Sequence, residues 1–414
     1  MNESKLELSP AGGTDSKCRE TTVESVLLCV FIALFVQLLF IIFVSLITGL
    51  APVFVRKYGF QIDFNDFFFA TSDWLHGVDP YLNSRFNKSP LILLAALSLQ
   101  FFGRGYGRII FLFINIAIVA ASLAGICYWF KMTRRASFLL FGIASIYFPV
   151  IFLLERGNLD GIMLGLILVS IFAKNRFTKE FALSLSIGIK VYSILLLVPM
   201  MLARLWKQVI AVLLLLVLLM LPFHSLFWSF IYAQTKRSGD LPGAENLCPI
   251  GMFSPINVTE AHQHYVLSHA VTLVYLAFWL ASYAFMLFRN RNSDLKVKAV
   301  YSFAWMLAMP LQVFPYTGIL LLPLLVLKSC EMAERCFITI PDRLFLIGFC
   351  LVGFQQTAFS SYFQFSLAAN LFPHAVKIFN TVNLLGTAFV IGSLMLQASN
   401  QNMRTDASIS VTEL

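Results

Sequence analysis

Long apolar runs separated by short polar segments dominate the chain from Leu27 almost to the C-terminus. A helix needs about 20 apolar residues to cross a hydrocarbon core of about 30 Å. Such runs predict membrane helices at about 24–50, 109–130, 136–154, 158–173, 208–230, 265–288, 298–314, 344–364 and 376–397. Four other apolar pieces are too short or marginal, and we expect them to be re-entrant or packed inside the protein: Leu91–Phe102, Phe181–Lys190, Ile194–Ala203 and Thr317–Leu327. The pattern predicts an all-α polytopic membrane protein.

The composition agrees with a chain whose solvent is lipid. Its 414 residues are 59% hydrophobic and 12% charged, with a mean hydropathy of +0.80, whereas a soluble domain carries about 25% charged residues. The net charge of +9 could suggest a nucleic-acid partner, but Lys and Arg lie in short clusters between apolar runs rather than along one basic face. Such clusters are typical of membrane topology, so we expect membrane lipids around the chain and no nucleic acid.

The basic clusters also predict an orientation, because Lys and Arg are retained on the cytoplasmic side. With a cytoplasmic N-terminus and a re-entrant Leu91–Phe102, every cluster falls inside: 131–135, 174–179, 204–207, 289–298 and 328–343. The expected parts are a cytoplasmic tail at 1–23, a single transmembrane domain at 24–398 and a cytoplasmic tail at 399–414. Two long polar segments, about 51–90 and 232–265, then face the external side of the cell (inner) membrane.

The first external segment concentrates acidic residues in a chain that has few elsewhere: Asp63, Asp66, Asp73 and Asp79. Asp79 precedes a proline, which is turn chemistry, so a solvated loop is enough to explain Asp73 and Asp79. Asp63 and Asp66 differ because phenylalanines surround them between positions 60 and 69. Where loop meets membrane, such a carboxylate loses water, and we expect its pKa to rise. A raised pKa suits a base that takes a proton from a sugar hydroxyl.

Two further segments place charge where the chain is otherwise apolar. ERGNLD, at 155–160, joins two predicted helices at their external ends. It can be a functional site at membrane depth, or a local Glu155–Arg156 ion pair followed by Asn158 as a helix N-cap. Lys190 lies in an apolar stretch with no acid nearby in sequence. It either snorkels to the external interface or needs an anionic partner, for which a lipid phosphate is a mobile candidate.

In their order and spacing these segments resemble the GT-C superfamily of polytopic glycosyltransferases. The closest likeness is to family 87, which includes polyprenyl-phosphate-mannose-dependent mannosyltransferases. The family has an acid-aromatic start, a G-x-D/N-P-Y turn, a Y-P-P-like helix start, an E-R-G-N/G-Q-N step and a K-x-Y-P step. The matching steps here are Asp63-Phe64, Gly77 to Tyr81, Phe86 to Pro90, Glu155 to Asn158 and Lys190 to Ser193. A later family step that contains His corresponds to 309–316, which keeps Pro310 and Tyr316 and lacks the His.

The resemblance implies a GT-C-like bundle of about 10–13 transmembrane helices, some of them short or re-entrant. It implies an inverting transfer on the extracytoplasmic side, from a polyprenyl-phosphate-linked sugar donor to a glycan or glycolipid acceptor. Asp63, with Asp66 as the alternative, would be the catalytic base, and Arg156 and Lys190 would hold the donor phosphate. The candidates for substrate binding are Asp79, Tyr81, Lys88, Glu155, Asn158, Tyr192 and Tyr316. Because the first loop has no DxD pair, we expect neither a metal nor another cofactor.

A transporter or flippase for a lipid-linked glycan is the main alternative, because it would also place a few charges in an aromatic-rich cavity. The chain shows no internal repeat of the kind common in secondary transporters, which weakens this alternative. A third reading is a non-catalytic subunit that keeps the fold without the chemistry. The readings differ in whether Asp63 is needed to form a glycosidic bond.

Overall fold

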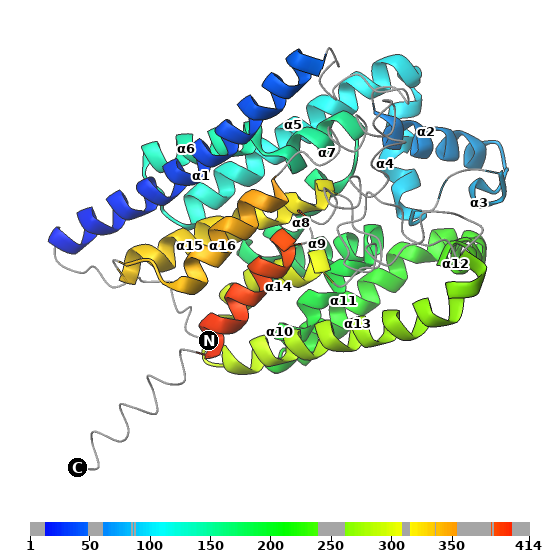
Figure 1. Ribbon diagram of the computed structural model, residues 1–414. Helices are drawn as coiled ribbons and strands as arrows, with labels where there is room; N and C mark the ends of the chain where they lie inside the picture. The colour runs from blue at the N-terminus through cyan, green and yellow to red at the C-terminus, as the bar shows by residue number, and fades with distance from the viewer. Residues whose placement is uncertain are drawn as a thin grey trace.

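The computed structural model describes residues 13–48, 61–83, 86, 88–238, 261–308, 315–335, 337–353, 382 and 385–399. Within these residues every regular element is a helix. Figure 1 shows the helices gathered side by side, with α1 beginning at the left and α2, α3 and α12 lying at the right. The predicted all-α class is therefore confirmed over the described part of the chain.

The helices follow one another as α1 (Gly13–Thr48), α2 (Ile62–Leu75), α3 (Pro80–Asn83), α4 (Leu91–Gln100), α5 (Gly103–Trp129), α6 (Arg134–Ile146), α7 (Phe148–Arg156), α8 (Asp160–Phe172), α9 (Arg176–Ile189), η1 (Val191–Leu196), α10 (Leu197–Leu202), α11 (Trp206–Met220), η2 (Leu221–Phe223), α12 (His224–Ser238), α13 (Ala261–Arg289), α14 (Leu295–Ala308), η4 (Pro315–Leu320), α15 (Leu321–Arg335) and α16 (Ile340–Val352). A further helix, Leu385–Ser399, lies near the C-terminus. Every predicted membrane segment contains a helix.

Among the described residues, three helical stretches are long and apolar enough to cross a membrane: Arg19–Phe40, Gly103–Trp129 and Trp206–Tyr232. In the most apolar part of each stretch, only 28%, 33% and 22% of the residues, respectively, are buried inside the protein. Most of these apolar side chains therefore face outward. Outward-facing apolar helices of this length are typical of contact with lipid. The predicted helix at 136–154 is instead divided into α6 and α7, which are bent by 55° and form a fourth candidate span.

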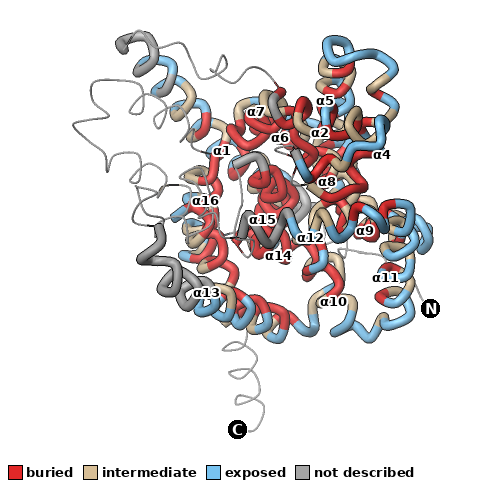
Figure 2. The backbone as a smooth tube through the Cα atoms, turned by 90° about the vertical axis from the view of Figure 1, so that its right-hand side faces the viewer, coloured by how far each residue is buried: buried red, intermediate tan, exposed pale blue. Residues whose placement is uncertain are grey.

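The apolar pieces that are too short to cross alone fold as short helices. α4 has 10 residues, and η1 with α10 covers Val191–Leu202. The marginal piece Thr317–Leu327 is divided between η4 and α15. Nearly every described side chain of α14 and α15 is buried, and Figure 2 shows these two helices in the interior of the bundle. The polar backbone of such short helices is shielded from lipid by the helices around them.

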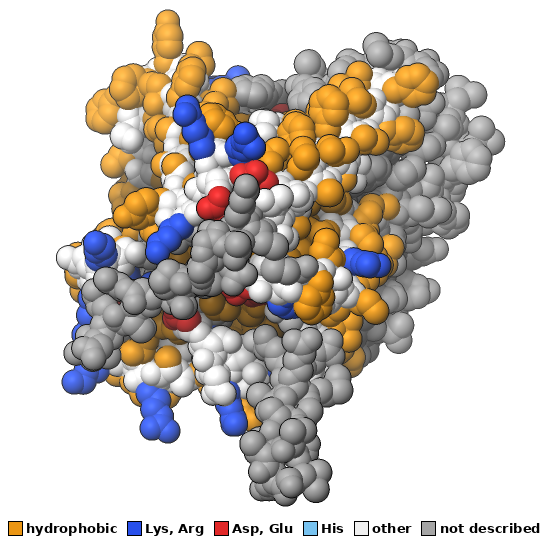
Figure 3. Space-filling model, turned by 90° about the vertical axis from the view of Figure 1, so that its left-hand side faces the viewer, with side chains coloured by type: hydrophobic (Ala, Val, Ile, Leu, Met, Phe, Trp, Pro, Cys, Tyr) orange, Lys and Arg blue, Asp and Glu red, His pale blue; other side chains and the backbone are white. Residues whose placement is uncertain are grey.

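Polar contacts show which helix ends lie at the same end of the bundle. The Thr133 hydroxyl, before α6, donates to Glu24 of α1 at 2.7 Å. Arg19 of α1 pairs with Glu334 of α15 at 3.5 Å. These are the ends to which the basic clusters assign the cytoplasmic side. Figure 3 shows the face of the molecule at the left of Figure 1, with Lys and Arg side chains spread among hydrophobic ones.

Two glycines of α8, one turn apart, allow this helix to pack closely against α5. A β-carbon on Gly161 would lie 3.0 Å from Oδ1 of Asn115 and 3.1 Å from Cγ2 of Val119. A β-carbon on Gly165 would lie 3.0 Å from Cγ2 of Ile118. Small residues at four-residue spacing let two helices approach closely in a membrane. α8 also packs against α9, so its first residues are fixed relative to both neighbours.

Candidate functional site

Asp63 lies in the first turn of α2 and its carboxylate is turned into the protein. One oxygen accepts a hydrogen bond from Nη2 of Arg156 at 2.8 Å, and the other accepts from Nδ2 of Asn158 at 2.7 Å. Arg156 is the last residue of α7, and Asn158 lies between α7 and α8. The structure therefore brings together three residues that the sequence singled out in two distant segments.

Gly157 allows its two neighbours in the chain to reach the same carboxylate. Its φ of +64° is in the left-handed region that favours glycine, and it ends α7. A β-carbon at Gly157 would lie 3.0 Å from Cβ of Gln61. The Gln61 N–H also donates to the carbonyl oxygen of Glu155 at 2.7 Å. The start of α2 is thus fastened to the turn between α7 and α8.

Lys190 joins this group through Asn158 and Asp160. Its Nζ donates to Oδ1 of Asn158 at 3.3 Å and to Oδ2 of Asp160 at 2.5 Å. The Tyr192 hydroxyl donates to the other oxygen of Asp160. The anionic partner that Lys190 was expected to need if it did not snorkel is present in the protein itself: it is Asp160, thirty positions earlier in the chain. A continuous polar network therefore runs from Arg156 through Asp63 and Asn158 to Lys190, Asp160 and Tyr192.

Lys88 is a third basic residue close to this network. Burial is the largest effect on its pKa and lowers it, as do the nearby charges of Lys190 and Arg156, while Asp63 and Asp66 act in the opposite direction. The resulting pKa lies below the ordinary value for lysine. Its Nζ also lies 5.8 Å from the centre of the Phe67 ring. Lys88 thus shares one electrostatic environment with both candidate bases and both candidate phosphate ligands.

The expected rise in the pKa of Asp63 is wrong. Burial does raise the pKa, but the charges of Lys88 and Arg156 and the hydrogen bonds from Asn158 and Arg156 lower it further than burial raises it. The net pKa lies below the ordinary value for aspartate. Sequence reasoning identified the burial of this carboxylate and missed the cations that surround it. Asp63 is therefore ionised at neutral pH and ready to accept a proton.

The other residues of the first external segment have mainly structural contacts. Asp79 Oδ1 accepts the backbone N–H of Tyr81 at 2.8 Å, which is the turn contact expected before a proline. The Tyr81 hydroxyl donates to the carbonyl oxygen of Lys88 at 2.8 Å and closes the segment. Asp66 is half-buried and acts electrostatically on Lys88. Asp79 and Tyr81 thus shape the loop that presents Lys88.

Three predicted site residues, Asn158, Glu155 and Tyr316, have further contacts or lie partly outside the described residues. Asn158 also accepts the backbone N–H of Asp160 at 3.2 Å, so its cap-like contact and its contact with Asp63 coexist. Glu155 is half-buried, and its carbonyl oxygen holds the start of α2. Tyr316 lies in η4, but its side chain is outside the described residues, as are most of 309–316 and most of 232–265.

Sequence reasoning missed two residues of the site. Asp160 is fully buried, and an acid in the first turn of an otherwise apolar helix was the available signal. Gln61 has φ 56°, which is rare for a residue other than glycine, and its buried amide has no hydrogen-bond partner among the described residues. Strain and unsatisfied polar groups gather at functional sites. No pattern in the sequence marks Gln61.

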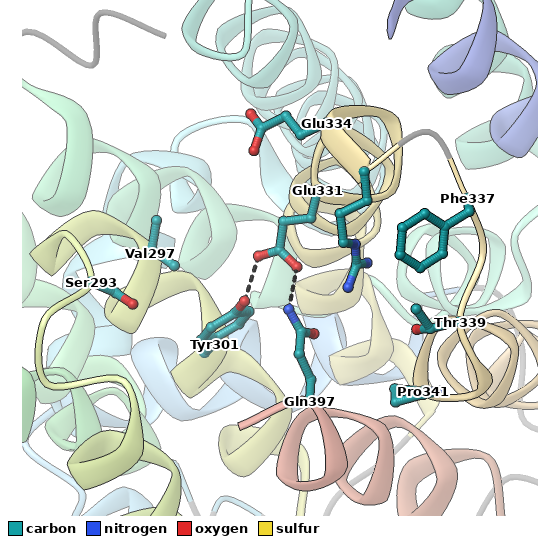
Figure 4. Close-up of a pocket in the computed structure, with 10 residues that line it drawn as sticks. Ser293, Val297, Tyr301, Glu331, Glu334, Phe337, Thr339, Pro341 and Gln397 are labelled. Carbon is teal, nitrogen blue, oxygen red and sulfur yellow. Dashed lines mark hydrogen bonds between the residues drawn. The ribbon is translucent and has the colours of Figure 1, made fainter. Parts of the chain in front are cut away.

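A separate pocket of about 380 Å³ lies beside α14 and α15 (Figure 4). Glu331 accepts hydrogen bonds there from the Tyr301 hydroxyl and from Nε2 of Gln397, the latter at 2.9 Å. Buried Lys328 lies 3.1 Å from Glu331, and Arg335 binds Asp342 with two hydrogen bonds. These charged side chains pair with one another around the pocket, and none of them belongs to the predicted site. Their arrangement is that of a structural network at the other end of the bundle.

Metal ligands and known relatives give no further guide to this site. Within the described ranges, no group of three or more His, Cys, Asp and Glu side chains is arranged to hold a metal ion. No protein-family model matches the chain, and no curated protein matches it in sequence. The geometry of the polar network is therefore the basis for a function of this protein.

Proposed function

We propose that the chain is an inverting glycosyltransferase of the GT-C type, which transfers a sugar from a polyprenyl-phosphate-linked donor to a hydroxyl of a glycan or glycolipid. One observation carries this proposal: the buried Asp63 carboxylate on α2 shares one hydrogen-bonded network with Arg156 and Lys190, and Lys88 lies near enough to act on it electrostatically. An acceptor hydroxyl needs a base, and a departing lipid phosphate needs fixed positive charge. Asp63 supplies the base, and Arg156, Lys190 and Lys88 supply the charge.

In the proposed reaction the acceptor oxygen attacks the anomeric carbon of the donor sugar from the face opposite the phosphate. The acceptor proton passes to the Asp63 carboxylate as the new glycosidic bond forms. The bond between the anomeric carbon and the phosphate oxygen breaks, and the lipid phosphate leaves with the electron pair. Its added negative charge is stabilised by the cations, which act without rearrangement because the network already holds them.

Arg156 and Lys190 can bind a phosphate although each is already paired with an acidic residue, Asp63 and Asp160 respectively. Arginine has five N–H donors and lysine has three, so each can hold its fixed partner and a ligand together. The side chains of Arg156 and Lys190 keep 27% and 20% of their surface exposed, whereas Asp63 and Asp160 are almost fully covered. The cations therefore form the accessible side of the network. Asp160 orients Lys190.

The decisive experiment compares Asp63→Asn with Asp73→Asn, a matched substitution in the same helix outside the network. Purified protein in liposomes is given polyprenyl-phosphate-linked radiolabelled mannose and a lipid-extract acceptor. Loss of a general base lowers transfer by about 10²–10⁴-fold, so Asp63→Asn is expected to be inactive and Asp73→Asn active. Size-exclusion profiles and melting temperatures report whether both variants fold.

Four results would count against the proposal or revise it. Transfer by folded Asp63→Asn at the rate of the wild type would exclude Asp63 as the base, and activity lost only in Asp66→Asn would assign that role to Asp66. Movement of the labelled lipid across the vesicle membrane without any glycosidic bond would establish the transporter reading instead. A wild-type protein with neither activity, whose variants leave cellular glycans unchanged, would be a non-catalytic subunit.

A further inference from the structure

Two arginines at the start of α5 converge on a single amide oxygen of α2. Nε of Arg104 and Nε of Arg108 donate to Oδ1 of Asn65 at 3.1 Å and 3.0 Å. Asn65 follows Asp63 by two positions, which is about 200° around a helix of 3.6 residues per turn. The arginine pair therefore lies on the side of α2 that faces away from the Asp63 network.

The charge of this pair is not neutralised by its contacts. Besides Asn65, the contact of these guanidiniums within the described ranges is the ring of Phe69, 5.0 Å from Arg104. Neither contact is a carboxylate. Two guanidiniums that share one neutral acceptor repel each other, and an anion between them would relieve the repulsion. Each still has four N–H donors on its Nη atoms, in the fork geometry that fits a phosphate.

The position of the pair along α5 indicates which phosphate is available. α5 is one of the candidate membrane spans and begins at Gly103, so Arg104 and Arg108 lie in its first two turns. The aromatic residues around them are turned outward, with Phe101 89% and Tyr106 74% exposed. Exposed aromatic side chains at the end of a spanning helix mark the level of the lipid headgroups. The guanidiniums are thus held at the depth where phospholipid phosphates lie.

We propose that Arg104 and Arg108 form a binding site for the phosphate of an anionic phospholipid. Asn65 spaces the two guanidiniums, and the exposed aromatic residues lie beside the lipid's glycerol and upper acyl chains. The site is separate from the proposed donor site and does not depend on the proposed transferase function. Its occupancy would hold α2, which carries Asp63, against the start of α5.

Native mass spectrometry of the protein released from nanodiscs tests this assignment. The nanodiscs contain phosphatidylglycerol, or phosphatidylcholine as the zwitterionic comparison. The wild type is expected to retain one more phosphatidylglycerol than the variant Arg104→Gln/Arg108→Gln. Retention by the variant should be at least tenfold weaker, because two charge-assisted contacts are removed. Arg134→Gln/Arg135→Gln is the matched control, because it removes two arginines from the first turn of α6 at the other end of the bundle.

A second variant keeps both arginines and the fold. Asn65→Asp places a carboxylate between the guanidiniums, so it is expected to reduce phosphatidylglycerol retention without loss of thermal stability. Three outcomes would overturn the proposal. They are equal retention by the wild type and the Arg104→Gln/Arg108→Gln variant, equal losses in the Arg134→Gln/Arg135→Gln control, and displacement of the lipid by excess inorganic phosphate, which would make free phosphate the ligand.

Discussion

At the residue scale, the central feature is a carboxylate that is buried and yet ionised. Burial alone would raise the pKa of Asp63, but nearby cations and two hydrogen bonds lower it below the ordinary value for aspartate. A base with a low pKa is weaker than one tuned to neutral pH, but it is fully deprotonated before the substrate arrives.

The low pKa of Asp63 makes a prediction about pH. Because the folded pKa is below the unfolded value of about 3.9, Asp63 stabilises the fold above that value, and the contribution is lost as pH falls through the folded pKa. We expect the melting temperatures of wild type and Asp63→Asn to differ by a constant amount from about pH 5 to 7 and to converge only below about pH 4. Convergence already between pH 5 and 6 would show that the pKa is raised.

The pair of Lys190 and Asp160 gives a second prediction at this scale. Asp160→Asn leaves the charge of Lys190 without its partner and is expected to cost about 3 kcal/mol, at the low end for a buried pair because Lys190 keeps some contact with solvent. Adding Lys190→Gln should restore most of that stability. Transfer should nevertheless fall about tenfold or more in Lys190→Gln alone, since a charge-assisted bond to phosphate is removed.

A double-mutant cycle on unfolding in mild detergent, combined with donor kinetics, separates these effects. If the changes in the free energy of unfolding caused by the two single substitutions add up to that of the double variant, the ion pair contributes nothing to stability. If Lys190→Gln transfers sugar with unchanged kinetics, Lys190 does not contact the donor.

At the scale of elements, the site depends on how closely α8 approaches α5. α8 begins with Asp160, and Gly161 directly follows it. The turn between α7 and α8 carries Asn158, and the start of α2 rests on that turn. A shift of α8 would therefore move the partners of both Asp63 and Lys190. Small residues in this crossing maintain the site even though they have no chemistry of their own.

Gly161→Val tests this dependence. Its new side chain meets Asn115 and Val119 of α5, and overpacking of this kind costs about 1–3 kcal/mol. We expect a lower melting temperature together with reduced transfer. Gly392→Val is the matched control, because a β-carbon at Gly392 has no atom within 4 Å among the described residues. Equal effects of the two substitutions would show that the α5–α8 crossing does not position the site.

At the scale of the whole molecule, the two ends of the bundle differ in kind. One end has α1, α6 and α15 joined by contacts such as that of Thr133 with Glu24. The other end has α2 docked on the turn between α7 and α8. Prediction of topology from the basic clusters places the first end in the cytoplasm. The donor would then be used on the external side.

Labelling with a membrane-impermeant maleimide tests this orientation. In a chain whose seven native cysteines are replaced, Val78→Cys lies in the exposed turn after α2, and Arg135→Cys lies at the start of α6. We expect Val78→Cys to react in intact cells and Arg135→Cys to react only after permeabilisation. The opposite pattern would invert the topology and place the Asp63 network in the cytoplasm.

The sequence by itself determined the helical class, the apolar segments and the segments that carry charge. These properties are local: hydrophobic periodicity selects helices, and a charge in an apolar run stands out without knowledge of its neighbours. The short helices α4 and α10 followed from length alone. The number of membrane crossings stays a prediction: in the part of the chain that the structure describes, three or four helical stretches are candidate spans, and the shorter apolar helices are left open.

Only the tertiary structure decided which charges meet. Asp63 and Arg156 are 93 positions apart, and no spacing rule joins them. The same is true of Lys190 and Asp160, which are 30 positions apart and form an ion pair. The pKa of a buried group depends on all the charges around it, so even the direction of its shift is a property of the fold. The sequence predicted only that Asp63 loses water, and the assembled helices showed both that it is buried and that nearby cations lower its pKa.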